Sequence, residues 1–199
     1  MNKLLTILVL CLLSTVIANA QILSPSRITK FKPINTTQVP VYILTNARVS
    51  IITGRDNKEF PSFVKVHLYH KGKGVLFGSP DIRNEMQVNS TFEFGLTKWT
   101  NTVNIGSFLL SDIQQTGIKL CIGYWPNLFT DAWRIEGISV TLEFKDQNGN
   151  LHPTLGNKTI VFNNANGFLN KWERYFECTA DGSFNPVISL IVQQTTDWN

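Results

Sequence analysis

Apolar and polar residues alternate along much of this chain, most clearly over residues 131–144, DAWRIEGISVTLEF. Trp133 and Ile135 alternate with charged residues, and the alternation resumes from Ile138 onward. Such a period of two is typical of a half-buried β-strand. The two halves are out of phase by one residue at Gly137, so both apolar sets can face one core only if a β-bulge lies there. The pattern therefore predicts a bent strand.

Shorter runs of the same kind recur along the rest of the chain and predict an all-β protein. The predicted strands cover residues 41–44, 48–53, 63–70, 87–95, 102–110, 118–124, 133–144, 159–162, 172–178 and 187–193. Turn signals rich in Gly, Asn and Asp separate them, and no stretch has a strong helical period. About ten short strands of this kind are typical of a two-sheet antiparallel β-sandwich in a single domain.

The N-terminal residues have the pattern of a secretory signal peptide. A single lysine precedes an apolar run, and Ala18-Asn19-Ala20 then gives the small-x-small pattern of a cleavage site. The alternative is a membrane anchor, but the run is shorter than the roughly 20 apolar residues that a spanning helix needs. We expect a signal peptide over residues 1–20, an extended lead-in over 21–38, a β-sandwich over 39–199, and secretion into an extracellular or periplasmic compartment.

Two cysteines, Cys121 and Cys178, remain once the signal peptide is removed. In an oxidising compartment they can form a disulfide, and we expect this bridge; two separate buried thiols are the alternative. The alternation over residues 118–124 places Cys121 on the face opposite to Ile118, Leu120 and Ile122. Any bridge to Cys178 is therefore expected outside the layer between the sheets.

The basic residues are unevenly distributed. Residues 27–73 contain nine basic side chains, Lys71 and Lys73 among them, against two acidic ones. A basic surface can attract anionic lipid, sulfated glycan or an acidic protein, although a solvated face is the alternative. We expect a membrane surface or a protein as partner, with carbohydrate as a further possibility, and no nucleic acid.

Catalytic and metal-binding motifs are not recognisable in the sequence. The histidines are His67, His70 and His152, and none stands beside a carboxylate at catalytic or metal-ligand spacing. His67 and His70 are three residues apart on a predicted strand and therefore face opposite sides. We expect neither an enzyme nor a metal site, although a small hydrolase assembled from distant residues stays open.

The best functional candidate is the loop over residues 123–130, which begins at the end of the predicted strand 118–124. It carries Tyr124, Trp125, Leu128 and Phe129 where a connection is normally polar. Exposed apolar loops often bind a membrane interface, a protein or the face of a sugar ring. The alternative is that these rings fold back over the end of the sandwich. Trp172, by contrast, is expected in the core or at its edge, since it lies at the start of a predicted strand.

The order of these strands resembles the PLAT (lipoxygenase homology) family of β-sandwich domains over about residues 47–175. The matching segments are 49–54 (VSIITG), 64–72 (VKVHLYHKG), 92–95 (FEFG), 118–123 (IKLCIG), 131–138 (DAWRIEGI), and Val161-Phe162 ahead of Lys171-Trp172. The resemblance implies a non-catalytic module that docks on membranes or on protein partners. Basic Lys71 and Lys73 are expected to assist the aromatic loop in docking.

The chain departs from that family between its first two strands. Many members have an acidic turn there that binds calcium, whereas this chain has residues 55–62, RDNKEFPS. The departure argues against a calcium site, so we expect no cofactor, with calcium as the alternative. A carbohydrate-binding or adhesion protein that stacks the same rings on sugars is the second functional hypothesis.

Overall fold

The computed structural model describes residues 39–99, 108–162, 165 and 167–192 of the chain, the last five by their backbone alone. The predicted signal peptide, the lead-in and most of the predicted strand 102–110 lie outside the described residues. No helix in the described part is long and apolar enough to cross a membrane.

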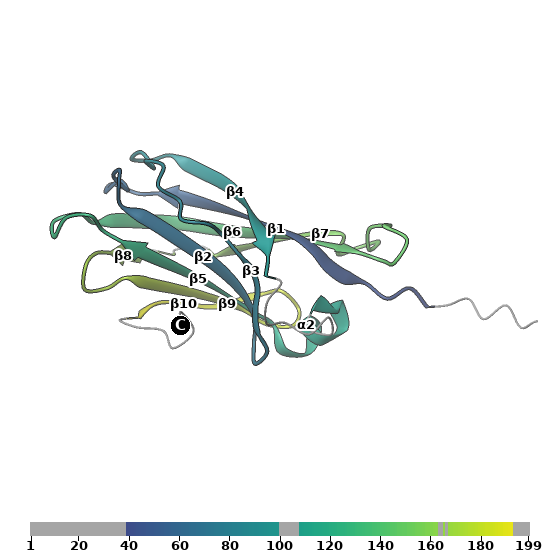
Figure 1. Cartoon of the computed structure of the whole chain (residues 1–199). Helices are drawn as coiled ribbons and strands as arrows, with labels where there is room; N and C mark the ends of the chain where they lie inside the picture. The colour runs from purple at the N-terminus through teal and green to yellow at the C-terminus, as the bar shows by residue number, and fades with distance from the viewer. Residues whose placement is uncertain (1–38, 100–107, 163–164, 166, 193–199) are drawn as a thin grey trace, which may run out of the picture. The chain divides into compact units, whose positions relative to one another are not determined.

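The described chain is built almost entirely from β-strands (Figure 1). The strands are β1 (Ile43–Thr53), β2 (Phe63–His70), β3 (Gly74–Gly78), β4 (Thr91–Lys98), β5 (Ile118–Trp125), β6 (Trp133–Lys145), β7 (Asn157–Phe162), β8 (Gly167–Leu169), β9 (Tyr175–Ala180) and β10 (Pro186–Val192), with a short helix α2 (Leu110–Thr116) before β5. The paired strands are antiparallel. The predicted all-β antiparallel class is therefore confirmed.

The strands form one continuous hydrogen-bonded path. Its order is β10-β9-β5-β2-β3-β4-β1-β6-β7, and β8 pairs with β6. The link between its two halves is β4, which pairs with β1 along its length and with β3 only at Lys98 and Thr97. The path curls so that β10 returns beside β7 and β8. The hydrogen bonding thus does not divide the strands into two separate sheets, and that part of the prediction is not confirmed.

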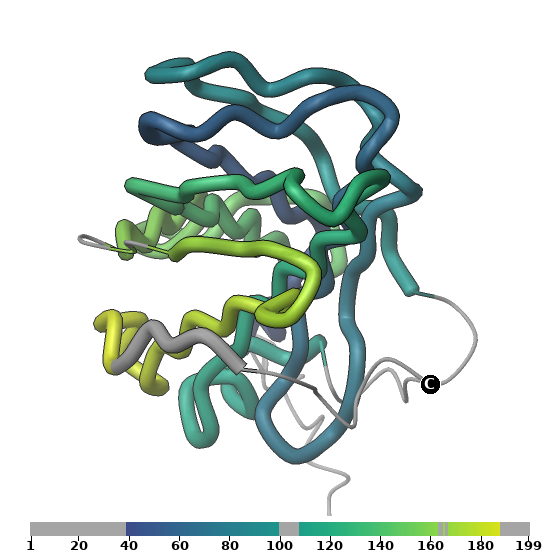
Figure 2. Tube along the Cα trace, turned by 90° about the vertical axis from the view of Figure 1, so that its left-hand side faces the viewer, coloured from purple at the N-terminus to yellow at the C-terminus, as the bar shows by residue number. Residues whose placement is uncertain are grey.

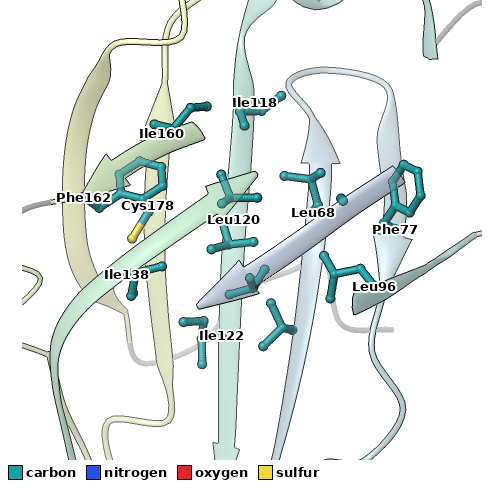
Figure 3. Packing of buried hydrophobic residues seen from close by; sticks show 14 of the residues in the cluster. Leu68, Phe77, Leu96, Ile118, Leu120, Ile122, Ile138, Ile160, Phe162 and Cys178 are labelled. Carbon is teal, nitrogen blue, oxygen red and sulfur yellow. The ribbon is translucent and has the colours of Figure 1, made fainter. Parts of the chain in front are cut away.

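The core lies between the two halves of this path. Figure 3 shows Ile138, Ile160 and Phe162 of β6 and β7 facing Leu120 and Cys178 of β5 and β9, and all of them are buried. The largest buried side chain is Trp133, whose indole N–H donates a hydrogen bond to Thr53 Oγ1 at 3.2 Å. Satisfying this donor allows a large ring to be buried without an orphaned polar group.

The predicted β-bulge lies at Gly137. Ile52 of β1 pairs with Gly137, but the next residue, Thr53, pairs with Ile135, so Glu136 is the extra residue on β6. Trp133, Ile135 and Ile138 are consequently all buried, while Glu136 is exposed. The change of phase in the sequence thus identified both the bend and its position.

Three elements were not predicted. β3 and β8 are too short for their period to be recognised, and α2 begins at Leu110, the last residue of the predicted strand 102–110. α2 buries only Leu110 and Ile113 and ends at Gly117, which has a φ of 81° that favours glycine. A seven-residue helix presents too few apolar positions for a helical period to stand out.

The expected disulfide is not seen in the structure. Cys121 and Cys178 are both buried, and no disulfide joins them. They lie on the neighbouring strands β5 and β9, but Cys178 pairs with Leu120 and Cys121 pairs with Glu177. Because successive side chains point to opposite faces, Cys178 packs in the core while Cys121 points away from it. The Cys121 thiol instead donates to Glu177 Oε1 at 3.3 Å.

Candidate functional site

Four connections meet at one end of the strand path, and we call this region the aromatic end. They are residues 54–62, 79–90, 126–132 and 170–174. The registers place them together, since Phe63 at the start of β2 pairs with Trp125 at the end of β5, and Tyr175 at the start of β9 pairs with Gly123. In Figure 1 these connections lie at the left, and Figure 2 looks onto them.

Bulky apolar side chains are exposed in every connection of the aromatic end. The exposed fractions are 70% for Phe60, 46% for Val88, 59% for Leu128, 70% for Phe129 and 73% for Trp172. A single exposed apolar residue needs no explanation, but several on neighbouring loops are typical of a surface that binds a partner or a membrane. The predicted exposure of Leu128 and Phe129 is therefore observed, and the alternative in which they fold back over the core is wrong for these two residues.

The loop that carries Leu128 and Phe129 is held by a small hydrogen-bond network. The buried Asp131 carboxylate accepts hydrogen bonds from Ser62 Oγ at 2.8 Å and from the Leu128 N–H at 3.2 Å. Ser62 Oγ in turn accepts from the Asn127 N–H at 2.9 Å. The network ties connection 126–132 to connection 54–62, so the loop is held in place with its apolar side chains pointing outward.

Tyr124 and Trp125 do not belong to the exposed patch. Both still lie on β5, where the alternation turns Tyr124 into the core beside Trp133, with ring centroids 5.9 Å apart. Burial raises the pKa of Tyr124 to about 12. Trp125 is half-buried, stacks on Phe63 with centroids 5.0 Å apart and planes 5° apart, and meets the edge of Tyr175. The prediction that these rings bind a ligand is wrong for Tyr124, which is fully buried, and stays a prediction for Trp125, which is half-buried against Phe63 and Tyr175.

Lys71 and Lys73 lie at the other end of the molecule. They form the turn between β2 and β3, next to His70, which pairs with Ile118 at the start of β5. The full length of β2, eight residues or about 26 Å at 3.3 Å per residue, separates this turn from the aromatic end. The Lys73 ammonium also forms an ion pair with Asp112 of α2. These lysines therefore cannot assist the aromatic loop in docking on one flat surface.

The cation closest to the exposed rings is Lys171. Its Nζ lies 2.8 Å from the centroid of the Phe129 ring and 5.9 Å from that of Trp172. Asn170 Oδ1 accepts hydrogen bonds from the Trp172 and Glu173 N–H groups at 2.8 and 3.0 Å. This turn precedes β9, so Trp172 lies before the strand, and the prediction that it belongs to the core is wrong. The sequence signal for the turn is Asn170, a residue that commonly closes such turns with its side chain.

Phe60 was also missed, although its sequence context is informative. It is the one large apolar residue in the polar connection RDNKEFPS, and it precedes Pro61. An aromatic residue without apolar neighbours at the alternating positions belongs to no strand, so exposure was the simplest expectation.

Lys58 is fully buried beneath the aromatic end. Its Nζ donates to the backbone carbonyls of Asn84 at 2.7 Å, Arg83 at 3.2 Å and Glu59 at 3.4 Å. Burial, with a further contribution from Arg83, lowers the pKa of Lys58 to about 8, and Glu85 partly opposes this shift. The ammonium thus joins connections 54–62 and 79–90.

The charges of the aromatic end are nearly balanced. Its four connections contain five basic and six acidic side chains. Asp56 pairs with Arg134 at 3.1 Å, and Asp81 pairs with Arg83 at 3.1 Å and with Lys65 at 3.2 Å. The excess of basic residues over 27–73 therefore does not make this surface strongly basic, and its apolar side chains distinguish it.

Outside the aromatic end, several titratable side chains of the described residues lie on the outer faces of the strands, where His67, Cys121 and Glu177 occupy paired positions on β2, β5 and β9. A shallow hollow of about 370 Å³ lies on the outer face of β1, β6 and β7, and Glu136 is the one titratable side chain that lines it. His67 lies on the outer face of β2, where burial and the neighbouring Lys65 lower its pKa to about 4. Within the described residues, no group of three or more His, Cys, Asp and Glu side chains is arranged to hold a metal ion.

Comparison with known proteins identifies no family for this chain. The sequence matches no protein-family model, and no curated protein matches it either. The geometry of the aromatic end is therefore the main guide to function.

Proposed function

We propose that this chain is an exported, non-catalytic binding module that docks on a membrane surface through its aromatic end. The observation that carries the proposal is the exposure of Phe60, Leu128, Phe129 and Trp172 on neighbouring connections. The architecture that we propose for it is a two-layer β-sandwich of the PLAT kind, in line with the resemblance over residues 47–175.

The apolar side chains supply most of the expected binding energy. Burying a large apolar side chain contributes about 1.5 to 3 kcal/mol, so four of them can offset a substantial part of the cost of association. A basic residue near an anionic surface contributes only about 1 kcal/mol. Because acidic side chains balance the basic ones at this end, the proposed docking depends weakly on lipid charge and on salt.

The chemistry of the exposed rings fits a membrane interface. An indole ring such as that of Trp172 is amphipathic and prefers the headgroup level of a bilayer, whereas the phenyl rings can reach the hydrocarbon. Lys171 can remain close to Phe129 at this level, with its ammonium directed toward lipid phosphates. The Asp131 network lowers the entropy cost of docking because it orders the loop in advance.

Flotation with phosphatidylcholine vesicles tests the proposal. The wild-type protein should float with the vesicles, and the double variant Phe129→Ala/Trp172→Ala should stay at the bottom of the gradient. Lys71→Ala/Lys73→Ala is the matched control at the opposite end and should float like the wild type. Absence of wild-type flotation, together with saturable capture of one protein or glycan that needs Phe129, would replace the membrane by that partner.

A further inference from the structure

We propose that the Lys58 ammonium is the resident cation of the aromatic end. It occupies a carbonyl-lined site between connections 54–62 and 79–90. There it binds oxygens from both connections and holds them together, as a bound metal ion does in other loop clusters, so that docking needs no calcium. Only the statement that docking needs no calcium rests on the proposed function. Its structural part can be tested on the protein in solution.

The geometry is that of a cation in a cage of oxygens. An ammonium has three N–H donors and no acceptor, and Lys58 Nζ has three backbone carbonyls within 2.7 to 3.4 Å. The oxygens come from both connections, since Glu59 follows Lys58 while Arg83 and Asn84 lie in connection 79–90. The exposed fraction of Lys58 is 0%, so the ammonium itself is covered, although Glu59, Arg83 and Asn84, which supply the carbonyls, are exposed residues.

The cage needs a cation because its oxygens converge. Carbonyl oxygens carry the negative end of the peptide dipole, and buried carbonyls without a donor are costly. The nearby charges only partly compensate each other, since Arg83 disfavours the ammonium and Glu85 favours it. Removing the Lys58 charge would therefore leave the carbonyls of Arg83 and Asn84 without their donor.

Calcium fits this site poorly. It takes six to eight oxygen ligands, usually with several carboxylates among them. In connection 54–62 the Asp56 carboxylate accepts from Arg134 Nε at 3.1 Å, and at the neighbouring loop Asp131 is bonded to Ser62. The described residues also lack a cluster of three possible metal ligands. The departure from the acidic turn of the PLAT family thus has a physical counterpart, because a lysine provides the positive charge internally.

The cage is coupled to the docking surface through the backbone. The Lys58 N–H donates to the Met86 carbonyl at 3.1 Å, and the Met86 N–H donates back to Lys58 at 3.0 Å. Phe60, which is 70% exposed, follows two residues later on the same connection. Fixing Lys58 therefore fixes the connection that presents Phe60.

The first test compares wild-type vesicle binding in millimolar calcium and in EDTA. The proposal expects dissociation constants within about twofold of each other, whereas tightening by calcium of about tenfold or more would overturn it. A calcium titration followed by thermal unfolding is the readout that does not need vesicles. It should leave Tm unchanged, and a rise in Tm with calcium would contradict the proposal.

The second test removes the ammonium. Lys58→Met retains the apolar stem and should lower Tm by at least about 5 °C, because the carbonyls of Glu59, Arg83 and Asn84 lose their donor and the two connections lose their link. Lys58→Ala should lower it further, and ethylammonium should restore part of the loss whereas ethanol should not. Arg55→Ala, an exposed change in the same connection, is the control and should leave Tm unchanged.

The outcomes separate this inference from the proposed function. If vesicles bind nothing but Lys58→Met still lowers Tm, docking is wrong and the cation cage stands. If vesicles bind and Lys58→Met has the Tm and affinity of the wild type, the cage is wrong and docking stands. If Lys58→Ala does not fold, Lys58→Met and the calcium titration of the wild type decide the question.

Discussion

The two ends of the strand path use the same scaffold but different loop chemistry. At the end opposite the aromatic end, Asp146 Oδ1 accepts from the Asn148 and Asn150 N–H groups, both at 2.8 Å. Asp181 Oδ1 likewise accepts from Asn185 at 2.8 Å and from Ser183 at 2.9 Å. These turns are closed by polar side chains of the kind that surface loops generally have.

The aromatic end has similar hydrogen-bonded turns but presents apolar side chains from them. Asn170 and Asp131 close its loops just as Asp146 and Asp181 close the others. The exposed Leu128, Phe129 and Trp172 are therefore not needed to form the turns. The turns thus do not explain why these side chains are exposed, and a role in binding is what we propose for them.

The largest expected effect is on docking at the aromatic end. Phe129→Ala/Trp172→Ala should weaken binding to phosphatidylcholine vesicles by about 100-fold or more, since it removes two apolar side chains worth at least about 1.5 kcal/mol each. Vesicle co-sedimentation across a lipid titration gives this ratio. Lys71→Ala/Lys73→Ala should change affinity by less than about twofold. Equal losses in the two double variants would remove the distinction between the ends.

A comparable effect on stability is expected from acid. Because the pKa of His67 is about 4 in the folded protein and 6.5 when unperturbed, the unfolded state binds more protons between these values. Stability should therefore be intact above pH 6.5 and should fall as the pH falls toward 4, by on the order of 3 kcal/mol. Urea unfolding across this range measures the loss. His67→Gln should flatten the curve there, and an unchanged slope would show that other groups are responsible.

A smaller loss should follow from releasing the aromatic loop. Asp131→Ala leaves the Ser62 hydroxyl and the Leu128 N–H without their acceptor and should cost about 1 to 3 kcal/mol of stability. Hydrogen exchange should increase at residues 127 and 128, and docking should weaken because a mobile loop must be ordered on binding. A variant with normal exchange at these positions would show that the network does not hold the loop.

The smallest effect is expected from the matched change at the opposite end. Asp146→Ala removes an exposed turn closure and should lower Tm slightly, with no change in vesicle binding. Hydrogen bonds from Asn150 above all, and from Asn148 and Gly149, hold the pKa of this carboxyl below its usual value, so the small loss should disappear in acid. A docking defect in this variant would mean that the two ends are coupled.

The regular part of the fold could be predicted from the sequence, whereas the site could be predicted only in part. Alternation identified the long strands and, through the phase change at Gly137, the bulge in β6. It could not identify β3 or β8, because three to five residues do not define a period. Nor could it show that the long path would be joined through two residue pairs between β3 and β4.

For the site, a local pattern identified Leu128 and Phe129 but could not find their neighbours. The sequence alone did not indicate the distance between Lys71 and Lys73 and the aromatic loop, and the β2–β5 register places these lysines at the opposite end. Contacts between loops that are far apart in the sequence bring Trp172, Lys171 and Lys58 to the aromatic end. A buried lysine held by backbone carbonyls has no sequence signature, because its partners are not side chains.

The most direct test of the account is the environment of position 129 on a membrane. An environment-sensitive NBD label attached at Phe129→Cys should shift its emission to the blue on addition of phosphatidylcholine vesicles, and the same label at Lys73→Cys should not shift. Cys121 and Cys178 are fully buried, so the introduced thiol should be labelled selectively. A label at position 129 that still reports water in the presence of saturating vesicles, or equal shifts at the two positions, would contradict docking through the aromatic end.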